Sequence, residues 1–580
     1  MIRKLLFIIS ALALIAGTVE ISAQDRVEKI DDLIQKMVDY NSFTGSALVV
    51  DDGDVIFKKG YSFANREWDI PNTVDTKFRL GSITKQFTAA IILKLREEGK
   101  LNLEDKITDH LKYYRKDTGD SVTIHQLLTH TSGIPSYTNL PNFFSEISTQ
   151  KTTVEEFVKN YCSGDFEFEP GSQFSYDNSG YYLLGAIIEE ITGMTYAEAL
   201  HLYILNPLQM NDSGFDKFED ILPKRATGYQ KLFIEYRNSP YINMEIPYAA
   251  GSMYSTVEDI YKWDRALYGT ELLSQESLDQ FFKPEVDALG GSYAYGWIIT
   301  EKDVDNDGAK ETIISHGGGI NGFNTLIARI PDKNQMVVLL NNTGGAPLNF
   351  MFDQILKIIN DQEYDYPKKG IGLTLYQKYE DMGIDDGVDY YNRLKQTEQL
   401  GLFYVDRAEL NSLAYYLLNK NDLDAAIKIA ELNMREYPDW FNVYDTYAEM
   451  LMEKGDKEKS IENYKKSLEL NPGNDGAIEK LKEMGVEYKK EISVTDDTMQ
   501  KYAGKYELAP SFILTIRHEP GQLYAQATGQ PEFPIFPSSE TKFYLKVVEA
   551  QIEFNKNESG EIESLTLYQN GRETPGKKIE

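Results

Sequence analysis

A serine and a lysine three residues apart, Ser82 and Lys85, have the clearest chemical potential in the sequence. Ser82 stands where an apolar helical pattern begins, and positions i and i+3 of a helix share one face, so the ammonium group can reach the hydroxyl. A serine hydroxyl becomes a strong nucleophile when a base removes its proton, and a lysine acts as that base when its pKa is lowered. The positive end of the helix dipole favours such lowering. The pair therefore indicates nucleophilic acyl transfer.

The same Ser-x-x-Lys spacing occurs elsewhere, so the pair alone does not identify a site. Ser148 and Lys151 repeat it, and so do Ser539 and Lys542. The sequence around each copy must therefore select among them.

Further segments that follow Ser82 resemble motifs of class C β-lactamases. Tyr176-Asp-Asn178 resembles their Y-x-N element, and Ser315-His316-Gly317-Gly318-Gly319 resembles their third element, with histidine in place of lysine. The segments 127–135 (LLTHTSGIP) and 250–256 (AGSMYST) are also similar to stretches of that family. Three motifs in this order select Ser82. The chain is thus identified as a member of the serine β-lactamase and penicillin-binding-protein superfamily.

The resemblance, which covers about residues 25–365, implies the catalytic roles. Ser82 would be the acylated nucleophile and Lys85 its hydrogen-bonded partner. Tyr176 would be the base for the attack and the acid for the leaving group. Because tyrosine normally titrates near pH ~10, it would share protons with the nearby lysine, and the two would titrate as a pair.

The resemblance also implies the substrate-binding residues. Asn178 would orient Lys85 and the substrate amide, while His316, Gly318 and Gly319 would line the substrate strand. The backbone N–H groups of Ser82 and Gly319 would form an oxyanion hole. A lysine at position 316 would be a fixed cation for a substrate carboxylate, whereas histidine is only partly charged near neutral pH. If His316 binds a carboxylate, turnover should fall as the pH rises above the histidine pKa.

Two functions remain open at this point. The first is a serine hydrolase that acts through an acyl-enzyme on an amide or ester, such as a D-amino-acid peptide, an ester or a β-lactam. The alternative is a catalytically weak or inactive peptide-binding sensor that recruits a partner protein. The two hypotheses differ in whether Ser82 is needed for chemistry.

Other chemistries have little support. The sequence contains no G-x-S-x-G, H-E-x-x-H or Walker motif. His125 and His130 are five residues apart, which does not place them on one helix face as a metal pair requires. Residues 303–308 resemble the start of a calcium loop, but Ile314 stands where its glutamate belongs, so a polar hairpin turn is expected. We predict no metal and no cofactor.

The motif residues need a large mixed domain to position them. Residues 24–365 alternate β-rich runs with helical segments, which favours an α/β (α+β) domain, and the resemblance implies the β-lactamase/transpeptidase-like fold. The clearest helix follows Ser82 and ends near Gly99. Its apolar stripe consists of Ile83, Phe87, Ile91 and Leu95.

Residues 371–490 are helical in pattern and contain a 34-residue repeat. Ala414 matches Ala448, and Pro438 matches Pro472. This period resembles tetratricopeptide repeats, in which small residues let paired helices approach and a proline ends the second helix. We expect two units and a truncated third. A partner-binding role and a spacer role are equally open.

Residues 495–580 alternate apolar and polar side chains, which predicts a small antiparallel β-barrel. The domain resembles small lipocalin-like domains appended to relatives of this family. The expected strands are 512–517, 522–527, 543–548, 550–554 and 564–568.

The first 23 residues have the order of a secretory signal peptide. Arg3 and Lys4 precede an apolar run over residues 5–16, and small residues lead to Ala23. The run is shorter than the ~20 residues that span a bilayer. We therefore expect residues 1–23 to be cleaved and the protein to be periplasmic or extracellular, with no membrane span afterwards.

Composition narrows the range of partners. The formal net charge of −31 disfavours binding to nucleic acids and anionic lipids. A small-molecule or peptide substrate fits better, with a protein partner possible at the repeats. The single cysteine, Cys162, cannot form an intramolecular disulfide and is expected to be a buried thiol.

Overall fold

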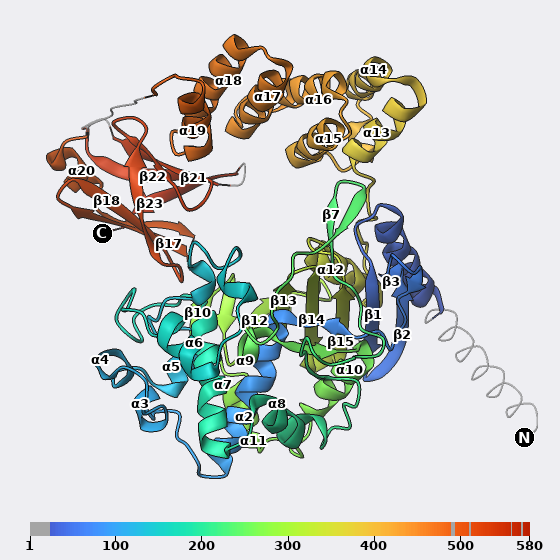
Figure 1. The fold of residues 1–580 in the computed structure, drawn as a ribbon, viewed down its shortest axis with the longest axis vertical. Coiled ribbons are helices and arrows are strands. Elements are labelled where there is room, and N and C mark those ends of the chain that lie inside the picture. Colours follow the sequence, from blue (N-terminus) through green and yellow to red (C-terminus); the bar gives the residue numbers. More distant parts are fainter. Residues whose placement is uncertain (1–23, 489–493, 510–511, 558–559, 570–571, 580) are drawn as a thin grey trace, which may run out of the picture. The chain divides into compact units, whose positions relative to one another are not determined.

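In the computed structural model the chain divides into two compact units, shown as a ribbon in Figure 1. The structure describes residues 24–488, 494–509, 512–557, 560–569 and 572–579. Unit 1 runs to Lys231 and continues from Glu235 to Pro367; unit 2 holds residues 232–234 and everything from Lys368 onward. The predicted signal peptide lies outside the described residues. Within those residues, no helix has the length and apolar character needed to cross a membrane.

An eight-stranded antiparallel sheet forms the centre of unit 1, with strand order β10-β11-β12-β13-β14-β15-β1-β2. The polar segment 303–310 is the hairpin turn between β12 and β13, as its sequence predicts. The strands are β1 (Gly45–Asp51), β2 (Asp54–Tyr61), β10 (Val286–Ala288), β11 (Gly291–Tyr293), β12 (Ile298–Lys302), β13 (Glu311–Ile320), β14 (Phe323–Ile330) and β15 (Gln335–Asn341).

Both faces of this sheet are buried at its centre, as strand β1 shows. Successive side chains of a strand point to opposite faces. Ala47 and Val49 pack in a cluster with the N-terminal helix (residues 24–39) and α12 (Leu348–Ile359). Leu48 and Val50 pack on the opposite side, in the core that contains α2 (Thr84–Glu97). The sheet is therefore a layer between two sets of helices, and its central strands β1, β14 and β15 are buried at nearly every position.

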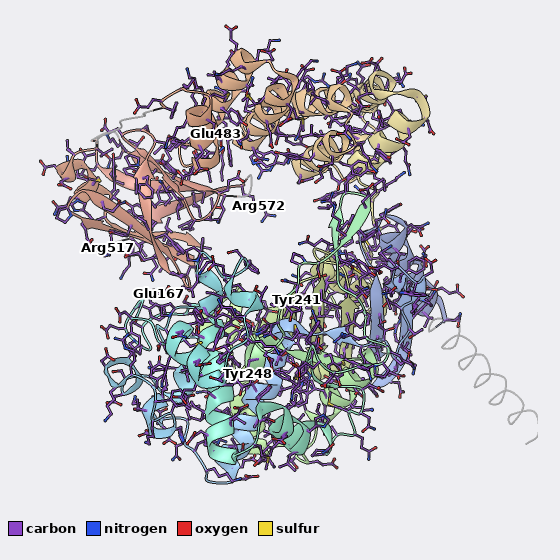
Figure 2. The ribbon with its side chains drawn as sticks, in the orientation of Figure 1. Glu167, Tyr241, Tyr248, Glu483, Arg517 and Arg572 are labelled. Atoms are coloured by element: carbon purple, nitrogen blue, oxygen red, sulfur yellow. The ribbon has the colours of Figure 1, made fainter. Side chains whose placement is uncertain are left out.

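The second set of helices carries most of the motif residues. Helix α2 contacts α7 (Asn178–Thr192) and α9 (Tyr248–Gly251). Tyr248, labelled in Figure 2, packs here against Tyr182 with ring centroids 4.8 Å apart. The remaining α-helices of unit 1 are α3 (Ile107–His110), α4 (Lys116–Gly119), α5 (Ile124–Leu128), α6 (Val154–Tyr161), α8 (Tyr196–Leu200), α10 (Val257–Ala266) and α11 (Gln275–Phe281).

Helix α2 confirms the stripe that the sequence predicts. Its stripe residues Ile83, Phe87, Ile91 and Leu95 are fully buried, and so are most of their neighbours. Gly99 follows the C-cap with φ of 69°, the left-handed conformation that favours glycine at a helix end. Cys162 is buried, as expected, in the same core.

Unit 2 begins with a run of paired helices. The predicted repeats are the antiparallel pairs α15/α16 and α17/α18, and α19 is the truncated third unit. The structure adds an earlier pair, α13/α14, which the repeat pattern misses because Glu380 and Tyr404 stand at the positions of Ala414 and Pro438. The helices are α13 (Ile371–Met382), α14 (Ile384–Gln396), α15 (Arg407–Asn419), α16 (Leu423–Glu436), α17 (Phe441–Lys454), α18 (Lys457–Leu470) and α19 (Asp475–Glu483).

The C-terminal region confirms the predicted barrel, which is closed and has eight strands. The expected strand 543–548 is shorter than predicted, because β20 ends at Leu545. Three strands, β16, β19 and β23, were not predicted; β19 and β23 contain prolines, which are rare within strands. The strands are β16 (Gly504–Ala509), β17 (Phe512–Glu519), β18 (Gln522–Ala527), β19 (Glu532–Pro537), β20 (Lys542–Leu545), β21 (Ala550–Lys556), β22 (Ile562–Gln569) and β23 (Arg572–Lys578).

Side chains fill the inside of this barrel. Tyr506, Phe543 and Phe554 belong to one buried cluster within it. Tyr502, from α20 (Asp496–Tyr502), stacks on Phe554 with ring centroids 4.2 Å apart. The barrel thus has a packed core of its own.

In unit 1, the turn that carries Ser82 lies directly against strand β13. A Cβ added to Gly318 would stand 1.9 Å from the carbonyl oxygen of Leu80. The Thr325 hydroxyl on β14 donates a hydrogen bond of 2.8 Å to the same carbonyl. Glycine at position 318 is therefore required by close backbone approach.

This contact predicts different effects for two neighbouring substitutions. Gly318→Ala should lower the free energy of unfolding by ~1–3 kcal/mol, because the methyl group forces β13 away from Leu80. Gly319→Ala is the matched control: its added Cβ meets nothing within 4 Å, and the change should stay within ~0.5 kcal/mol. Urea denaturation followed by tryptophan fluorescence measures both, since Trp263 and Trp297 are buried in unit 1. Equal effects would contradict the close approach.

Candidate active site

Lys85 lies at the centre of a small polar cluster. Its Nζ atom is 3.2 Å from Ser82 Oγ, 2.8 Å from Asn178 Oδ1 and 3.0 Å from the carbonyl oxygen of Ala250. Ser82 belongs to a 3₁₀ turn, Gly81–Ile83, that leads into α2, so the two side chains stand one turn apart on one face. The structure therefore brings Ser82, Lys85 and Asn178 together.

Burial makes Lys85 a weak base that is partly neutral at physiological pH. Its side chain is fully buried, and this burial lowers its pKa to about 7, against the opposing effect of the Asp177 charge. The Ala250 carbonyl and Asn178 Oδ1 can only accept hydrogen bonds. In the neutral amine they take its two protons, and the lone pair is left for the Ser82 hydroxyl.

The other two Ser-x-x-Lys copies have different surroundings. Ser148 Oγ bonds the carbonyl of Phe144, while Lys151 is exposed and pairs with Glu219. Lys542 approaches Glu553, and Ser539 Oγ accepts a hydrogen bond from the Lys542 backbone. Neither serine has a buried amine beside it.

Tyr176 stands just before α7, with its ring beside Lys85 Nζ at 4.9 Å from the centroid. Its hydroxyl oxygen is buried and has no hydrogen-bond partner within the described part of the chain. Burial raises the pKa of Tyr176, and the Ser82 hydroxyl, close by but outside hydrogen-bond geometry, lowers it less. The phenol is therefore protonated at neutral pH.

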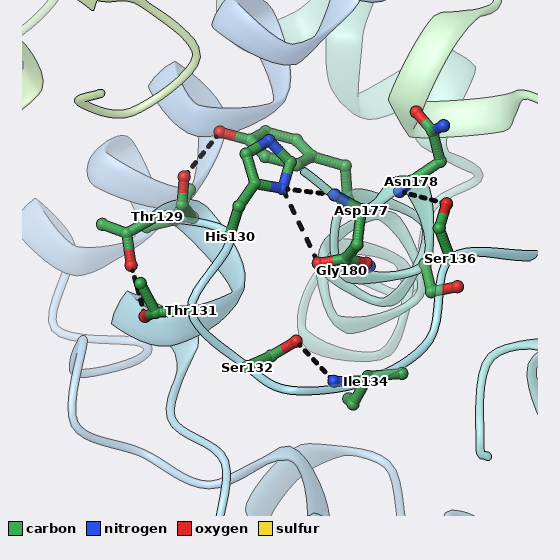
Figure 3. A network of polar contacts seen from close by, with 12 residues as sticks. Thr129, His130, Thr131, Ser132, Ile134, Ser136, Asp177, Asn178 and Gly180 are labelled. Atoms are coloured by element: carbon green, nitrogen blue, oxygen red, sulfur yellow. Dashed lines mark hydrogen bonds and ion pairs between the residues drawn. The ribbon is translucent and has the colours of Figure 1, made fainter. Parts of the chain in front are cut away.

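A loop after α5 fixes the start of α7. The backbone N–H of Asn178 donates to Ser136 Oγ at 3.0 Å, and its side-chain Nδ2 donates to Thr138 Oγ1 at 3.1 Å. Figure 3 shows the Ser136 contact, with His130 beside Asp177. Because Nδ2 is held by Thr138, Oδ1 of the same amide faces Lys85.

His316 lies on β13 at the edge of the site and is almost fully buried. Burial lowers its pKa to about 3, so the imidazole is neutral across the physiological range. It offers no cation, and the pH dependence expected for a charged His316 would fall far below neutral pH. Gly319 lies beside the nucleophile turn: an added Cβ on Gly81 would be 2.8 Å from Gly319 N.

A cavity of about 650 Å³ opens at these residues. Its lining includes Ser82, Tyr176 and His316, together with the apolar residues Ile313, Leu326 and Phe352. The one ion pair on its wall joins Lys302 and Asp353 at 2.7 Å. Among the described residues, no group of three or more His, Cys, Asp or Glu is arranged to hold a metal ion.

Several residues of the site escape sequence reasoning. The Ala250 carbonyl binds Lys85 through the backbone, which leaves no mark on residue type. His130, for which the sequence indicates only that it forms no metal pair with His125, contacts the Tyr176 ring with centroids 4.3 Å apart. Both lie in the segments 127–135 and 250–256 that resemble family stretches, and this was the available signal.

Family models match three regions of the chain. Residues 30–358 match the family model described as Beta-lactamase, residues 441–474 match Tetratricopeptide repeat, and residues 488–578 match a domain of unknown function, DUF3471. The last match contains the eight-stranded barrel.

Relatives and solved structures cover the same part of the chain. Penicillin-binding protein 4* of Bacillus subtilis (strain 168) is 28% identical over 386 residues, 61% of this chain and 82% of that protein. A penicillin binding protein structure from Bacillus halodurans has 29% identity and a TM-score of 0.50, covering 57% of this chain and 98% of that one. D-amino acid amidase from Ochrobactrum anthropi SV3, at 24% identity, TM-score 0.51 and coverage of 58% and 98%, shows the shared fold. Since the family match spans more than half of the sequence, the chain belongs to the β-lactamase and penicillin-binding-protein superfamily of serine hydrolases.

Proposed function

We propose that this protein hydrolyses an amide or ester through an acyl-enzyme on Ser82, and that its substrate carries no free carboxylate next to the scissile bond. The observation that carries the proposal is the buried Lys85 amine, with a pKa of about 7 and its Nζ 3.2 Å from Ser82 Oγ. A base poised near the working pH is what activation of a serine requires.

The proposed reaction has two half-cycles, acylation and deacylation of Ser82. Lys85 Nζ takes the Ser82 proton as Oγ forms a bond to the carbonyl carbon, and the backbone N–H groups of Ser82 and Gly319 stabilise the oxyanion. Tyr176 gives its phenolic proton to the leaving nitrogen or oxygen as that bond breaks, and Lys85 returns a proton to Tyr176. Water then attacks the ester, with the proton transfers reversed, and releases the acid and free Ser82.

These roles differ from those that the resemblance implies for Tyr176. A base must lose its proton near the working pH, and burial raises the pKa of Tyr176 while it lowers that of Lys85. We therefore assign the base to Lys85 and the acid to Tyr176. Lys85 Nζ lies 4.9 Å from the centroid of the Tyr176 ring, so the two side chains are neighbours in the site.

The charges around the cavity support a substrate that is neutral near Ser82. His316 is uncharged, and the cation in the cavity wall, Lys302, is neutralised by Asp353 at 2.7 Å. A carboxylate moved next to the neutral imidazole would lose its hydration without a fixed positive charge in return. The apolar residues of the cavity favour an apolar group on the acyl portion.

The nucleophile can be tested by covalent labelling. A fluorophosphonate should add one adduct to the intact chain, mapped to Ser82 by peptide mass spectrometry, because among the three Ser-x-x-Lys serines Ser82 alone has a buried amine beside it. Ser82→Ala should abolish the adduct. Ser148→Ala, at the second Ser-x-x-Lys copy, is the matched control and should label at the wild-type rate. Persistent labelling in folded Ser82→Ala protein would contradict the proposal.

The substrate preference can be tested with one peptide in two forms. A short D-amino-acid peptide with an apolar acyl side chain is offered with a free C-terminal carboxylate next to the scissile bond, or with that carboxylate amidated. We expect kcat/KM at least about tenfold higher for the amidated form, because one unpaired buried charge costs more than the ~1.4 kcal/mol equivalent to a factor of ten. Equal or faster cleavage of the carboxylate form would refute the neutral-substrate assignment.

A further inference from the structure

We propose that His130 and Tyr293 are positioning residues for Tyr176 and for the substrate edge of β13. They form the middle of a buried hydrogen-bond chain that joins the start of α7 to His316. The expected effect on catalysis rests on the proposed hydrolase function. The hydrogen-bond chain is a structural feature that can be tested separately, through the tautomers of its histidines.

The chain has four links. The Asp177 backbone N–H donates to His130 Nδ1 at 3.1 Å, and His130 Nε2 lies 3.1 Å from Tyr293 Oη. Tyr293 Oη lies 3.3 Å from His316 Nε2, and His316 Nδ1 lies 2.6 Å from the Gly317 carbonyl oxygen. The three side chains are almost entirely buried, so these links are shielded from water.

Backbone groups at the two ends fix the direction of every link. The Asp177 N–H can only donate, and it lies 3.1 Å from His130 Nδ1, closer than the Asp177 carboxylate oxygen at 3.6 Å, so Nδ1 accepts and the His130 proton sits on Nε2. The Gly317 carbonyl can only accept, so the His316 proton sits on Nδ1 and its Nε2 accepts. The Tyr293 hydroxyl therefore accepts from His130 and donates to His316. Both histidines are neutral in this arrangement, in agreement with burial, which lowers the pKa of each.

The rings of the chain surround Tyr176. The His130 ring lies against it with centroids 4.3 Å apart, and the rings of Tyr293 and His316 lie 6.2 Å and 6.1 Å away. The Tyr176 hydroxyl has no hydrogen-bond partner of its own among the described residues, so ring packing sets its direction. Holding these rings in place therefore holds the proton donor in place.

The chain also defines what His316 does. Both of its ring nitrogens are engaged, one by Tyr293 and one by the Gly317 carbonyl. Its side chain thus fixes the backbone of β13 between Ser315 and Gly318, where the strand passes the nucleophile turn. In this proposal His316 positions the backbone of β13, and the substrate contacts that backbone at the edge of the strand.

The chain offers a matched pair of tyrosines for the test. Tyr293 and Tyr295 are both fully buried, and each has its hydroxyl on a histidine ring: Tyr293 on His130, and Tyr295 on His125 Nδ1 at 2.7 Å. Phenylalanine in place of either removes one hydroxyl and keeps the ring. Only Tyr293 belongs to the chain behind Tyr176.

We expect Tyr293→Phe to lower kcat about tenfold, because the loosened rings misplace the proton donor Tyr176, with KM within about twofold of wild type. Tyr295→Phe should keep both kcat and KM within about twofold. A Tyr293→Phe variant that matches Tyr295→Phe, or a loss confined to KM, would overturn the positioning role. If the wild type turns over no amide or ester, the proposed function fails. The histidine tautomers, measured by NMR as described next, still test the hydrogen-bond chain in that case.

The second measurement is the nitrogen NMR spectrum of the full chain with labelled histidine, assigned with His130→Asn and His316→Asn variants. At neutral pH, His130 should be protonated on Nε2 and His316 on Nδ1, and neither should titrate near its ordinary pKa. In Tyr293→Phe both signals should shift, whereas Tyr295→Phe should shift only His125. Opposite tautomers, or a doubly protonated ring at neutral pH, would contradict the proposed hydrogen-bond chain.

Discussion

The site depends on the burial of one amine. An ammonium group that leaves water must find hydrogen-bond acceptors or give up its proton, and Lys85 has two obligatory acceptors, the Ala250 carbonyl and Asn178 Oδ1. The third hydrogen-bond partner of Lys85 Nζ is the Ser82 hydroxyl. Three helices meet to build this arrangement, because α2 carries Lys85, α7 begins at Asn178 and α9 contains Ala250. The same burial that costs folding free energy makes the amine a base near neutral pH.

Apart from the Asp177 carboxylate, whose charge raises the pKa of Lys85, the titratable side chains named around that amine are neutral. Tyr176, His130 and His316 are buried and neutral, and burial moves each of their pKa values toward the uncharged form. A cation at position 316 would lower the pKa of Lys85 further and attract carboxylates. A neutral imidazole does neither, and it leaves both of its nitrogens free to join Tyr293 and the Gly317 carbonyl. The side chain at position 316 therefore influences both the charge of the preferred substrate and the pKa of Lys85.

The sequence predicted the parts of the fold that depend on periodicity and on side-chain motifs. The stripe of α2, the 34-residue repeat and the final barrel all follow from spacing, and Ser82 was separated from the other copies by the motifs after it. Contacts between distant segments were beyond such reasoning. His130 and Tyr293 are 163 residues apart, and Ala250 binds Lys85 through a carbonyl that any residue has. The pKa order of Lys85 and Tyr176 also depends on burial, which motifs do not specify.

The most direct test of the central claim is the rate of Ser82 phosphonylation by a fluorophosphonate, which releases fluoride, as a function of pH between about pH 5 and pH 10. A lysine must lose its proton to act as a base, so the rate should rise with pH, about tenfold per unit below pH 7, and level off above the Lys85 pKa of about 7. A rate that keeps rising toward pH 10 would identify Tyr176 as the base. A rate independent of pH through neutrality would show that no amine activates Ser82, and either result would contradict this account.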